Sequence, residues 1–434
     1  AGVDVDFEGV ARFNPNIIIE HVKKAPRSIV LRARNPKQDV YLRDGRLAFA
    51  SGTGMYVIEN NAARKATYQD CCSWAKLTDA IENVEFSVEI HSTDMPPELT
   101  DRYNFKAMAT NTTKPFLGSS LSKAGVLDEI EMAAAIAGGK EELRKRSQWC
   151  TPFAAISPLT WSENACTVFK ETAPYNIPAL VSGQSVIGGT SPVTVAGTLA
   201  QTNAESLSGI VYNQILKKGR PCILNIGFSH PMDMKTCLAL HGNVVAGIVA
   251  AGGAQLARYY GLPSASWMAT DSKSSDAQSG YEKAMTGIIP ALAGVSYVQG
   301  MGQAEFTYAV DFEKLIIDDE IVTQMKRIIK GIEVNEETLC LEAIERVGIG
   351  GSFLTSKARE TFKFIAKETT ELTVGDRNTR EKWLQSGARS MGERARERVK
   401  EILTTHEPEP LDKDLIKKLD EIIDNARRNL ARKK

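Results

Sequence analysis

Two acids and a lysine stand near one another in the second half of the chain: Asp271, Lys273 and Glu305. Carboxylates and amines of this kind carry out general acid–base catalysis, and a lysine can also form a Schiff base with a carbonyl substrate. For the second role, an apolar pocket would have to depress the pKa of Lys273. These three residues are the catalytic candidates, and a lyase or hydrolase is one activity that they indicate.

Aromatic side chains recur around the same positions. The aromatic candidates are Phe153, Phe228, Trp267, Phe306 and Tyr308, and the acids beside them are Asp271, Asp276 and Glu305. Aromatic faces with nearby carboxylates suit a quaternary ammonium ion, whose nitrogen cannot donate a hydrogen bond. The pattern predicts a site for such a cation, with the hydrophobic core as the alternative place for these rings.

Polar groups for the other end of a ligand follow three apolar runs: His91, Gln184 and His230. Each can donate a hydrogen bond to a carboxylate. His230 also fits an ordinary structural histidine. The predicted substrate ligands are therefore His91, Phe153, Gln184, Phe228, His230, Trp267 and Tyr308.

Several other chemistries lack their motifs in this sequence. There is no HExxH and no pair of histidines at ligand spacing, which argues against a zinc site. A GxSxG nucleophile elbow and a P-loop are absent as well. The sequence predicts neither metal ligands nor a tightly bound cofactor.

Short apolar runs and helical patterns alternate regularly from about residue 84. The runs are 84–92, 114–120, 147–155, 178–184, 222–228, 262–268, 294–300 and 314–318. Eight β/α units over roughly 250 residues are typical of a TIM barrel. A doubly wound sheet is the alternative, but no GxGxxG turn follows an early strand. We therefore expect an α/β fold, with a (β/α)8 barrel over residues 84–330.

Two extensions flank the predicted barrel. Residues 1–83 contain short runs with Asn-Pro and Asp-Gly turns, which indicate a small antiparallel meander, followed by a helix over Tyr68–Ile81. Residues 331–434 read as charged helices, either solvated or docking a partner. Because a barrel carries its functional groups at the C-terminal ends of its strands, we expect the candidate residues to open onto one face.

Composition narrows the class of protein. Lys and Arg number 53, as do Asp and Glu, and this balance argues against a general nucleic-acid binder. No stretch reads as a membrane span.

The seven cysteines show no CxxC pair or zinc-ribbon spacing, which favours a reducing cytoplasm. No secretory signal is visible, and we expect a trimmed start because Ala1 stands in place of Met. Whether the chain forms a homo-oligomer stays open.

Four segments together resemble one known family. They are APRSIVLRARNP with DVYL, SPVTVAGTLAQTNAESLSGIV, GLPSASWMATDSKSSDAQSGYE and KLIIDDEIV. Nearly the whole chain is similar to the trimethylamine methyltransferase family. The resemblance implies a TIM-barrel enzyme that passes a methyl group from a methylated amine to the cobalt of a separate corrinoid protein. The founding branch carries pyrrolysine in its active site, at a position expected here in the loop near Lys273. No non-standard letter occurs, so the resemblance is to the branch without it.

The missing pyrrolysine implies a quaternary rather than a tertiary amine, because a quaternary ammonium loses a neutral amine without proton transfer. Glycine betaine is the expected donor and Co(I) the acceptor, giving dimethylglycine and methyl-Co(III). Proline betaine and carnitine stay open as donors. In this interpretation Trp267, Phe228 and Phe153 pack the trimethylammonium head, and Asp271 or Glu305 compensates its charge. A barrel that binds betaine or docks the corrinoid protein without catalysis is the alternative.

A corrinoid is too large to enter a filled barrel. The methyl group must then be presented at the open C-terminal mouth, where the corrinoid protein docks. Loops 272–280 and 301–308 are expected to form part of this docking surface, with Lys273 and Lys283 among its charges.

Overall fold

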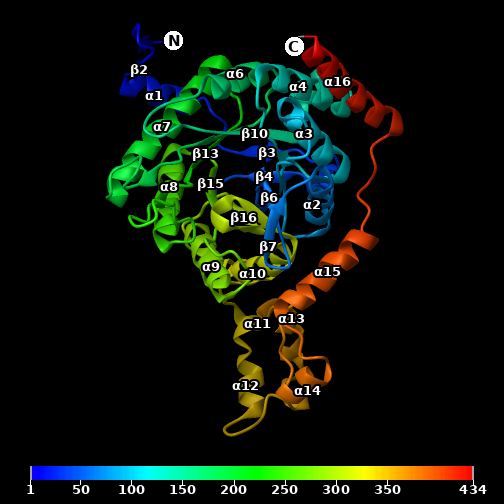
Figure 1. Cartoon of the computed structure of the whole chain (residues 1–434). Helices are drawn as coiled ribbons and strands as arrows, with labels where there is room; N and C mark the ends of the chain where they lie inside the picture. Colours follow the sequence, from blue (N-terminus) through cyan, green and yellow to red (C-terminus); the bar gives the residue numbers. More distant parts are fainter. Residues whose placement is uncertain (1, 433–434) are drawn as a thin grey trace.

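A closed ring of eight parallel strands forms the centre of the molecule (Figure 1). The computed structural model describes residues 2–432. The ring strands are β5 (Ala48–Ser51), β8 (Ser87–Val88), β9 (Phe116–Leu117), β10 (Trp149–Ala154), β11 (Ala179–Ser182), β13 (Cys222–Gly227), β15 (Ser264–Trp267) and β16 (Tyr297–Met301). Their order is β5-β16-β15-β13-β11-β10-β9-β8, and a parallel bridge between Ala50 and Phe86 joins the two ends. The predicted TIM barrel is confirmed.

One predicted strand is wrong. Residues 314–318 lie inside helix α10 (Phe312–Lys330), whose N-cap Asp311 accepts hydrogen bonds from the backbone of Glu313 and Lys314. The missing strand is β5, which pairs with β16 from within the segment expected to be an N-terminal extension. The division into three domains stays a prediction, but its boundary at residue 83 separates β5 from the rest of the ring.

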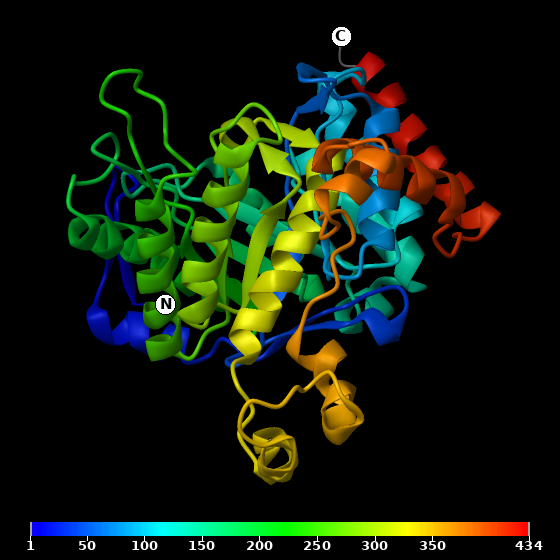
Figure 2. The ribbon, with the colours of Figure 1, turned by 90° about the horizontal axis from the view of Figure 1, so that it is seen from below.

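Helices cover the outside of the ring (Figures 1 and 2). They are α2 (Tyr68–Ala80), α3 (Thr100–Asn111), α4 (Lys123–Ala137), α6 (Glu163–Thr172), α7 (Val195–Leu216), α8 (Val244–Tyr260), α9 (Ala277–Leu292) and α10. The helix expected over Tyr68–Ile81 is confirmed as α2: Thr67 and Asp70 form a capping box, and Trp74 and Leu77 are buried. Polar N-caps such as Asn243 and Asp276 start the helices that follow β13 and β15, because a side-chain oxygen satisfies free N–H groups there.

The barrel interior is filled by apolar side chains that alternate along the strands. Phe86 and Tyr297 meet edge to face with ring centroids 4.8 Å apart, and Leu117, Leu180 and Ile223 pack in the same cluster. The antiparallel pair β3 (Ile29–Leu31) and β4 (Val40–Leu42) belongs to this cluster too. Figure 2 places it at the end opposite the long loops. One end of the barrel is thus closed, and ligands have access from the C-terminal end.

Only part of the expected N-terminal meander exists. Besides β3 and β4, the strands β6 (Tyr56–Glu59) and β7 (Ala62–Lys65) form a hairpin. Strand β18 (Ala309–Asp311) pairs in parallel with β6, and β17 (Gln303–Ala304) pairs with β18. This small sheet ties the loop after β16 to the N-terminal part of the chain.

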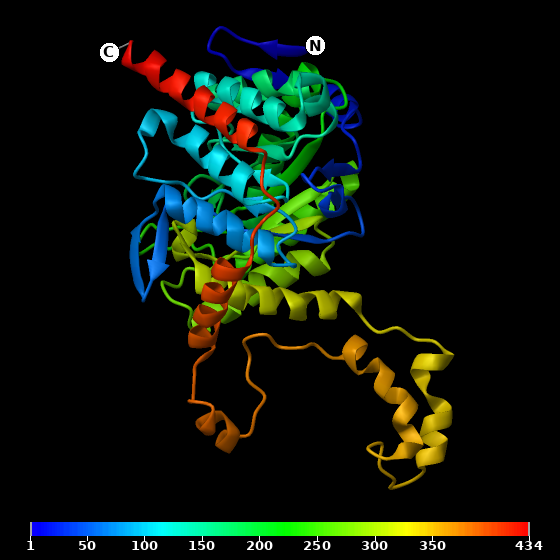
Figure 3. The same cartoon turned by 90° about the vertical axis from the view of Figure 1, so that its right-hand side faces the viewer.

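The C-terminal part divides into packed helices and a projecting arm. Helix α15 (Met391–Thr405) packs on α10 and α2, and α16 (Lys413–Ala431) packs on α4 and buries Leu419 and Ile422. Between them, His406 contacts Asp79 at 2.8 Å. The projecting arm has two segments between residues 331 and 388, one with α12 (Leu341–Val347) and one with α14 (Arg380–Gln385) (Figure 3). Between them the chain returns to α10, where Glu320 accepts the N–H groups of Thr373, Val374 and Gly375. Within the described part of the chain, no helix is long and apolar enough to cross a membrane.

Candidate active site

Five aromatic rings gather where β13, β15 and β16 end. We call Phe228, His230, His241, Trp267 and Phe306 the aromatic cluster. The Phe228 ring lies 4.2 Å from Trp267 and 4.8 Å from His230, centroid to centroid. His241 lies 3.7 Å from His230 and 6.5 Å from Phe306. The predicted neighbourhood of Phe228, His230 and Trp267 is therefore present in the fold.

A hydrogen bond fixes the orientation of Trp267. Its indole Nε1 donates to Oε1 of Gln303 at 3.2 Å, and Nε2 of Gln303 donates to the backbone oxygen of Thr53 at 2.9 Å. Gln303 is buried. The strand approaches so closely here that a Cβ on Gly300, whose φ is +116°, would lie 2.3 Å from the oxygen of Met268. A larger residue at position 300 would displace Trp267.

The two histidines of the cluster are neutral rings. Burial lowers the pKa of His241 to about 4 and that of His230 well below its usual value, where the neighbouring imidazole adds to the effect. Neutral imidazoles bring no positive charge to the site. A cation can therefore bind against the rings of the cluster without electrostatic repulsion from the histidines.

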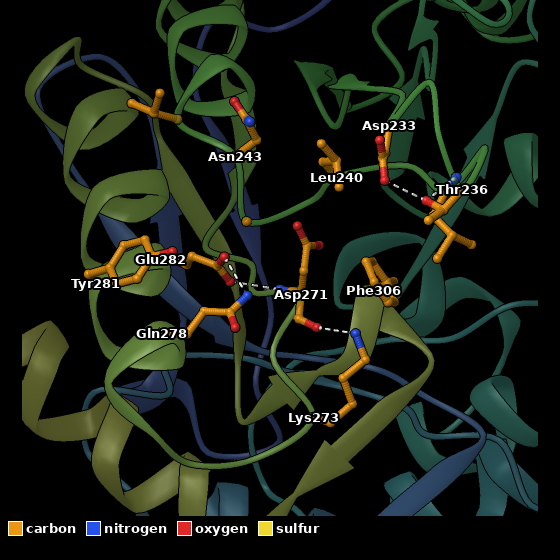
Figure 4. A pocket seen from close by; sticks show the side chains of 13 residues that line it. Asp233, Thr236, Leu240, Asn243, Asp271, Lys273, Gln278, Tyr281, Glu282 and Phe306 are labelled. Carbon is orange, nitrogen blue, oxygen red and sulfur yellow. Dashed lines mark hydrogen bonds between the residues drawn. The ribbon is translucent and has the colours of Figure 1, made fainter.

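A cavity of about 550 Å³ opens beside Phe306 (Figure 4). It lies between the loop that follows β13 and the first turns of α8 and α9. Its walls are Asp233, Thr236, Leu238, Leu240, Gly242, Asn243, Val244, Asp271, Lys273, Gln278, Tyr281, Glu282 and Phe306. Of the catalytic candidates, Asp271 and Lys273 line this cavity, whereas Glu305 does not.

Asp271 is the acid best placed to act on a ligand. One carboxylate oxygen accepts a hydrogen bond from the backbone N–H of His241 at 2.8 Å. Its own N–H donates to the carboxylate of Glu282 at 2.8 Å, and Glu282 also accepts the hydroxyl of Thr270. Burial raises the pKa of Asp271 to about 6, and the nearby Glu282 adds to the rise. This carboxyl group changes charge just below neutral pH.

The turn from Glu305 to Thr307 has an unusual backbone. Its φ angles are 52° at Glu305, 55° at Phe306 and 73° at Thr307, all in the left-handed region. That conformation costs roughly 1–2 kcal/mol for each residue with a side chain. Backbone hydrogen bonds from Glu305 to Ser272 and from Phe306 to Thr270 hold the turn against the loop after β15. The result is a fixed Phe306 ring, over which Nζ of Lys273 lies 4.0 Å from the centroid.

The remaining predicted ligands follow two other strands of the ring. His91 follows β8, across the ring from β13, with Nδ1 3.8 Å from Oε1 of Glu89 and 3.4 Å from Asn104. Gln184 follows β11 and is half-buried. The residue after Gln184, Ser185, accepts the backbone N–H of His230 at 3.4 Å, which brings this loop beside the aromatic cluster. The roles of His91 and Gln184 as ligands stay predictions.

Two placements correct the sequence analysis, and a third residue stays a prediction. Phe153 lies on the outer side of β10, where its ring packs 5.6 Å from that of Phe169 in α6, so it cannot line the mouth. Tyr308 is 57% exposed and is not among the residues that line the cavity, and its role as a ligand stays a prediction. Lys283 is fully buried, with Nζ 3.0 Å from Asp318, and cannot belong to a docking surface.

Sequence reasoning also missed two groups. His241 stacks on His230, and the signal for it was its place two residues before the N-cap Asn243 of a helix. Glu89 follows β8 and accepts the N–H of Ser119 at 2.6 Å, while burial raises its pKa to about 8. No sequence pattern marks Glu89, because its burial depends on helices packed behind it.

Binding of a simple cation should depend on pH through Asp271. Tetramethylammonium should bind about fivefold more weakly at pH 5 than at pH 7, because protonation removes the attracting charge. The bound cation favours the carboxylate, so the midpoint in the complex should lie below the value of about 6. Calorimetric titration from pH 5 to 7 measures this.

Two variants make the pH test specific. Asp271→Asn should bind weakly at both pH values, whereas Glu89→Gln, across the mouth, should keep the pH dependence of the unmodified protein. An unaltered pH profile in Asp271→Asn would assign the titration to another group.

A closed parallel barrel with its candidate groups at the C-terminal ends of the strands has the architecture of a TIM-barrel enzyme. The family model described as trimethylamine methyltransferase (MTTB) matches residues 1–431. The chain belongs to the trimethylamine methyltransferase family. It is a methyltransferase, of class EC 2.1.1.

Relatives of known name agree with this membership. Trimethylamine methyltransferase MttB of Desulfitobacterium hafniense (strain DSM 10664 / DCB-2) is 33% identical, over 98% of this chain and 86% of the relative. The glycine betaine methyltransferase of D. hafniense (strain Y51) is 32% identical, over 93% and 84%. The solved monomethylamine methyltransferase (MtmB) of Methanosarcina barkeri superimposes with a TM-score of 0.51 at 12% identity, covering 91% of this chain and 81% of that chain. This last likeness shows the fold alone.

Proposed function

We propose that the protein moves a methyl group from a quaternary amine, with glycine betaine as the first candidate, to the Co(I) of a corrinoid held by a partner protein. The products would be dimethylglycine and methyl-Co(III). The observation that carries this proposal is the aromatic cluster of neutral rings beside the Asp271 carboxylate. Such a site suits a cation with no N–H group. The 32% identical relative named glycine betaine methyltransferase supports the choice of donor.

The protein's part in this reaction is positioning and charge. The faces of Trp267, Phe228 and Phe306 would hold the trimethylammonium group, and Asp271 would supply a compensating negative field. The leaving group is a neutral amine, so the displacement itself needs no proton transfer from the chain. In-line attack requires the scissile C–N bond to point out of the mouth, where the acceptor approaches.

An apolar rim around the mouth supports docking of a corrinoid protein there. Successive loops carry exposed side chains: Ile156 at 58%, Leu159 at 66%, Val193 at 75% and Met234 at 72%. These loops follow β10, β11 and β13. Exposed apolar residues gathered at one end favour a protein interface. A cobalt cofactor carried by such a partner would meet the methyl group at the mouth.

Substitutions on this rim should affect methyl transfer to the corrinoid protein more than methyl transfer to free cobalamin. Met234→Glu and Val193→Glu should slow methyl transfer to the cognate corrinoid protein several-fold or more, because a charge is buried at the interface. Transfer to free cobalamin should change little, since a small acceptor needs only the mouth. Initial rates with both acceptors, followed by the cobalt spectrum, measure this. Equal losses with both acceptors would move these residues into the substrate site.

The direct test of the function is methyl transfer itself. The protein is incubated with glycine betaine and a reduced corrinoid protein, and the cobalt spectrum is followed. Formation of methyl-cobalt supports the proposal. Binding of betaine without transfer, despite a competent partner, would instead favour a non-catalytic binding role. The lyase or hydrolase alternative has less support, because Lys273 is exposed and Glu305 does not line the cavity.

We also propose a cytoplasmic location. All seven cysteines are free thiols, and Cys71, Cys150 and Cys222 are buried singly in the core. Unpaired thiols are typical of a reducing compartment.

A further inference from the structure

Lys273 brings a positive charge to a cavity that otherwise carries acids (Figure 4). Its Nζ donates a hydrogen bond of 2.9 Å to the backbone oxygen of Asp271 and lies over the Phe306 ring. An ammonium group has three N–H donors. No ion pair joins Lys273 to any residue that the structure describes. Two donors are therefore available to a ligand in the cavity.

The position of this ammonium is fixed by the fold. Phe306 lies under it because the left-handed turn from Glu305 to Thr307 is held by backbone hydrogen bonds to Thr270 and Ser272. Lys273 itself belongs to the same loop after β15. Ring and ammonium are thus paired before a ligand arrives, which lowers the cost of ordering the lysine on binding.

The cavity is lined by three acids, Asp233, Asp271 and Glu282, and by the single cation Lys273, which shares its loop with Asp271. A simple tetraalkylammonium ion is attracted by the Asp271 carboxylate but repelled by the Lys273 ammonium. A neutral amine uses neither charge. A zwitterion, with a quaternary nitrogen at one end and a carboxylate at the other, meets an opposite charge at both ends.

We propose that Lys273 selects quaternary amines that carry a carboxylate. Its ammonium binds that carboxylate and thereby turns the methylated nitrogen toward Asp271 and the aromatic cluster. Lys273 is in this view a specificity and positioning residue rather than an acid, base or Schiff-base former. The inference rests on the proposed methyl transfer from a quaternary amine.

The test compares two cations that differ in the carboxylate. Affinities for glycine betaine and for tetramethylammonium are measured by calorimetry on the full chain, together with methyl transfer to reduced cobalamin. The variants are Lys273→Met, which keeps the length, and Lys273→Arg, which keeps the charge. Lys235→Met is the matched control, because Lys235 is an exposed lysine on the neighbouring loop that does not line the cavity.

Lys273→Met should weaken betaine binding about tenfold to a hundredfold, the loss expected for a charge-assisted hydrogen bond. Its affinity for tetramethylammonium should stay the same or rise, since a repelling charge is gone. Lys273→Arg should keep most of the betaine affinity, and Lys235→Met all of it.

Three outcomes would overturn the inference. They are unchanged betaine binding in Lys273→Met, a parallel loss for both cations, and a wild-type preference for tetramethylammonium. If wild-type protein transfers methyl groups from betaine and Lys273→Met does so equally well, this inference fails while the proposed function stands. If wild-type protein neither binds nor demethylates betaine, both fail.

Discussion

Asp318→Ala should lower the free energy of unfolding by about 3–5 kcal/mol, the usual loss when a buried charge is left without its partner. Asp318 and its two lysine neighbours are almost wholly buried: Nζ of Lys283 lies 3.0 Å from its carboxylate and Nζ of Lys314 3.6 Å. Its Oδ2 also accepts the N–H of Gly302 at 2.7 Å. Removing the carboxylate leaves two ammonium groups in the protein interior.

Denaturant titration of the purified variant measures this loss. The matched control is Glu368→Ala. It breaks an exposed ion pair between Glu368 and Arg327, and Arg327 lies on α10, the helix that also carries Asp318. Such surface pairs contribute about 0–1 kcal/mol. If Asp318→Ala lowers the free energy of unfolding no more than the control does, the two lysines must lose their protons or become hydrated in the variant. Burial already lowers the pKa of Lys283 to about 8, which makes discharge the physical alternative.

Trp267→Ala should weaken binding of a quaternary ammonium ligand by about 1–2 kcal/mol or more, the range for a desolvated cation–π contact. Trp267 packs 4.2 Å from Phe228, and Gln303 holds its indole ring in place. Calorimetry with glycine betaine measures the change. Trp267→Phe, which keeps an aromatic face, should recover part of the affinity.

The control for the Trp267 variant is Trp383→Ala, on the projecting arm, where the indole stacks with Arg380. It should leave binding unaltered. Circular dichroism and a thermal melt check that each variant is folded. A correctly folded Trp267→Ala protein with unchanged betaine affinity would remove this residue from the site.

Periodic patterns were enough to predict most of the ring, because seven of the strands are apolar runs that end just before a polar loop. The run at 314–318 misled because a short apolar segment fits a strand and a buried helix equally well. Leu315, Ile316 and Val322 are buried on one side of α10 at helical spacing. The true remaining strand, β5, is four residues long and lies among turns that suggested an antiparallel meander.

The sequence does not show in which direction each side chain points, and this limited how much of the site could be predicted. Phe153 lies near the end of a strand at the mouth, as expected, but strand residues alternate between faces. Cys150, three positions earlier, points into the barrel, so Phe153 points outward to the helices. Lys283 reads as a surface charge because lysine is rarely buried. Its burial is tolerated because Asp318 and the backbone oxygen of Gly300, both later in the chain, bind its ammonium group.

The pairing of β5 with β16 also governs how the barrel is made. Ala48 of β5 pairs with Tyr297 of β16. The first ring strand to be synthesised therefore stays unpaired on this edge until the last ring strand has been made. Until β16 is made, the edges of β5 and β15 that it will join expose unpaired backbone groups, which are prone to pair with other chains. Contacts this distant in sequence slow folding. We therefore expect the nascent chain to depend on chaperones until β16 has left the ribosome, and fragments that stop short of residue 301 to aggregate.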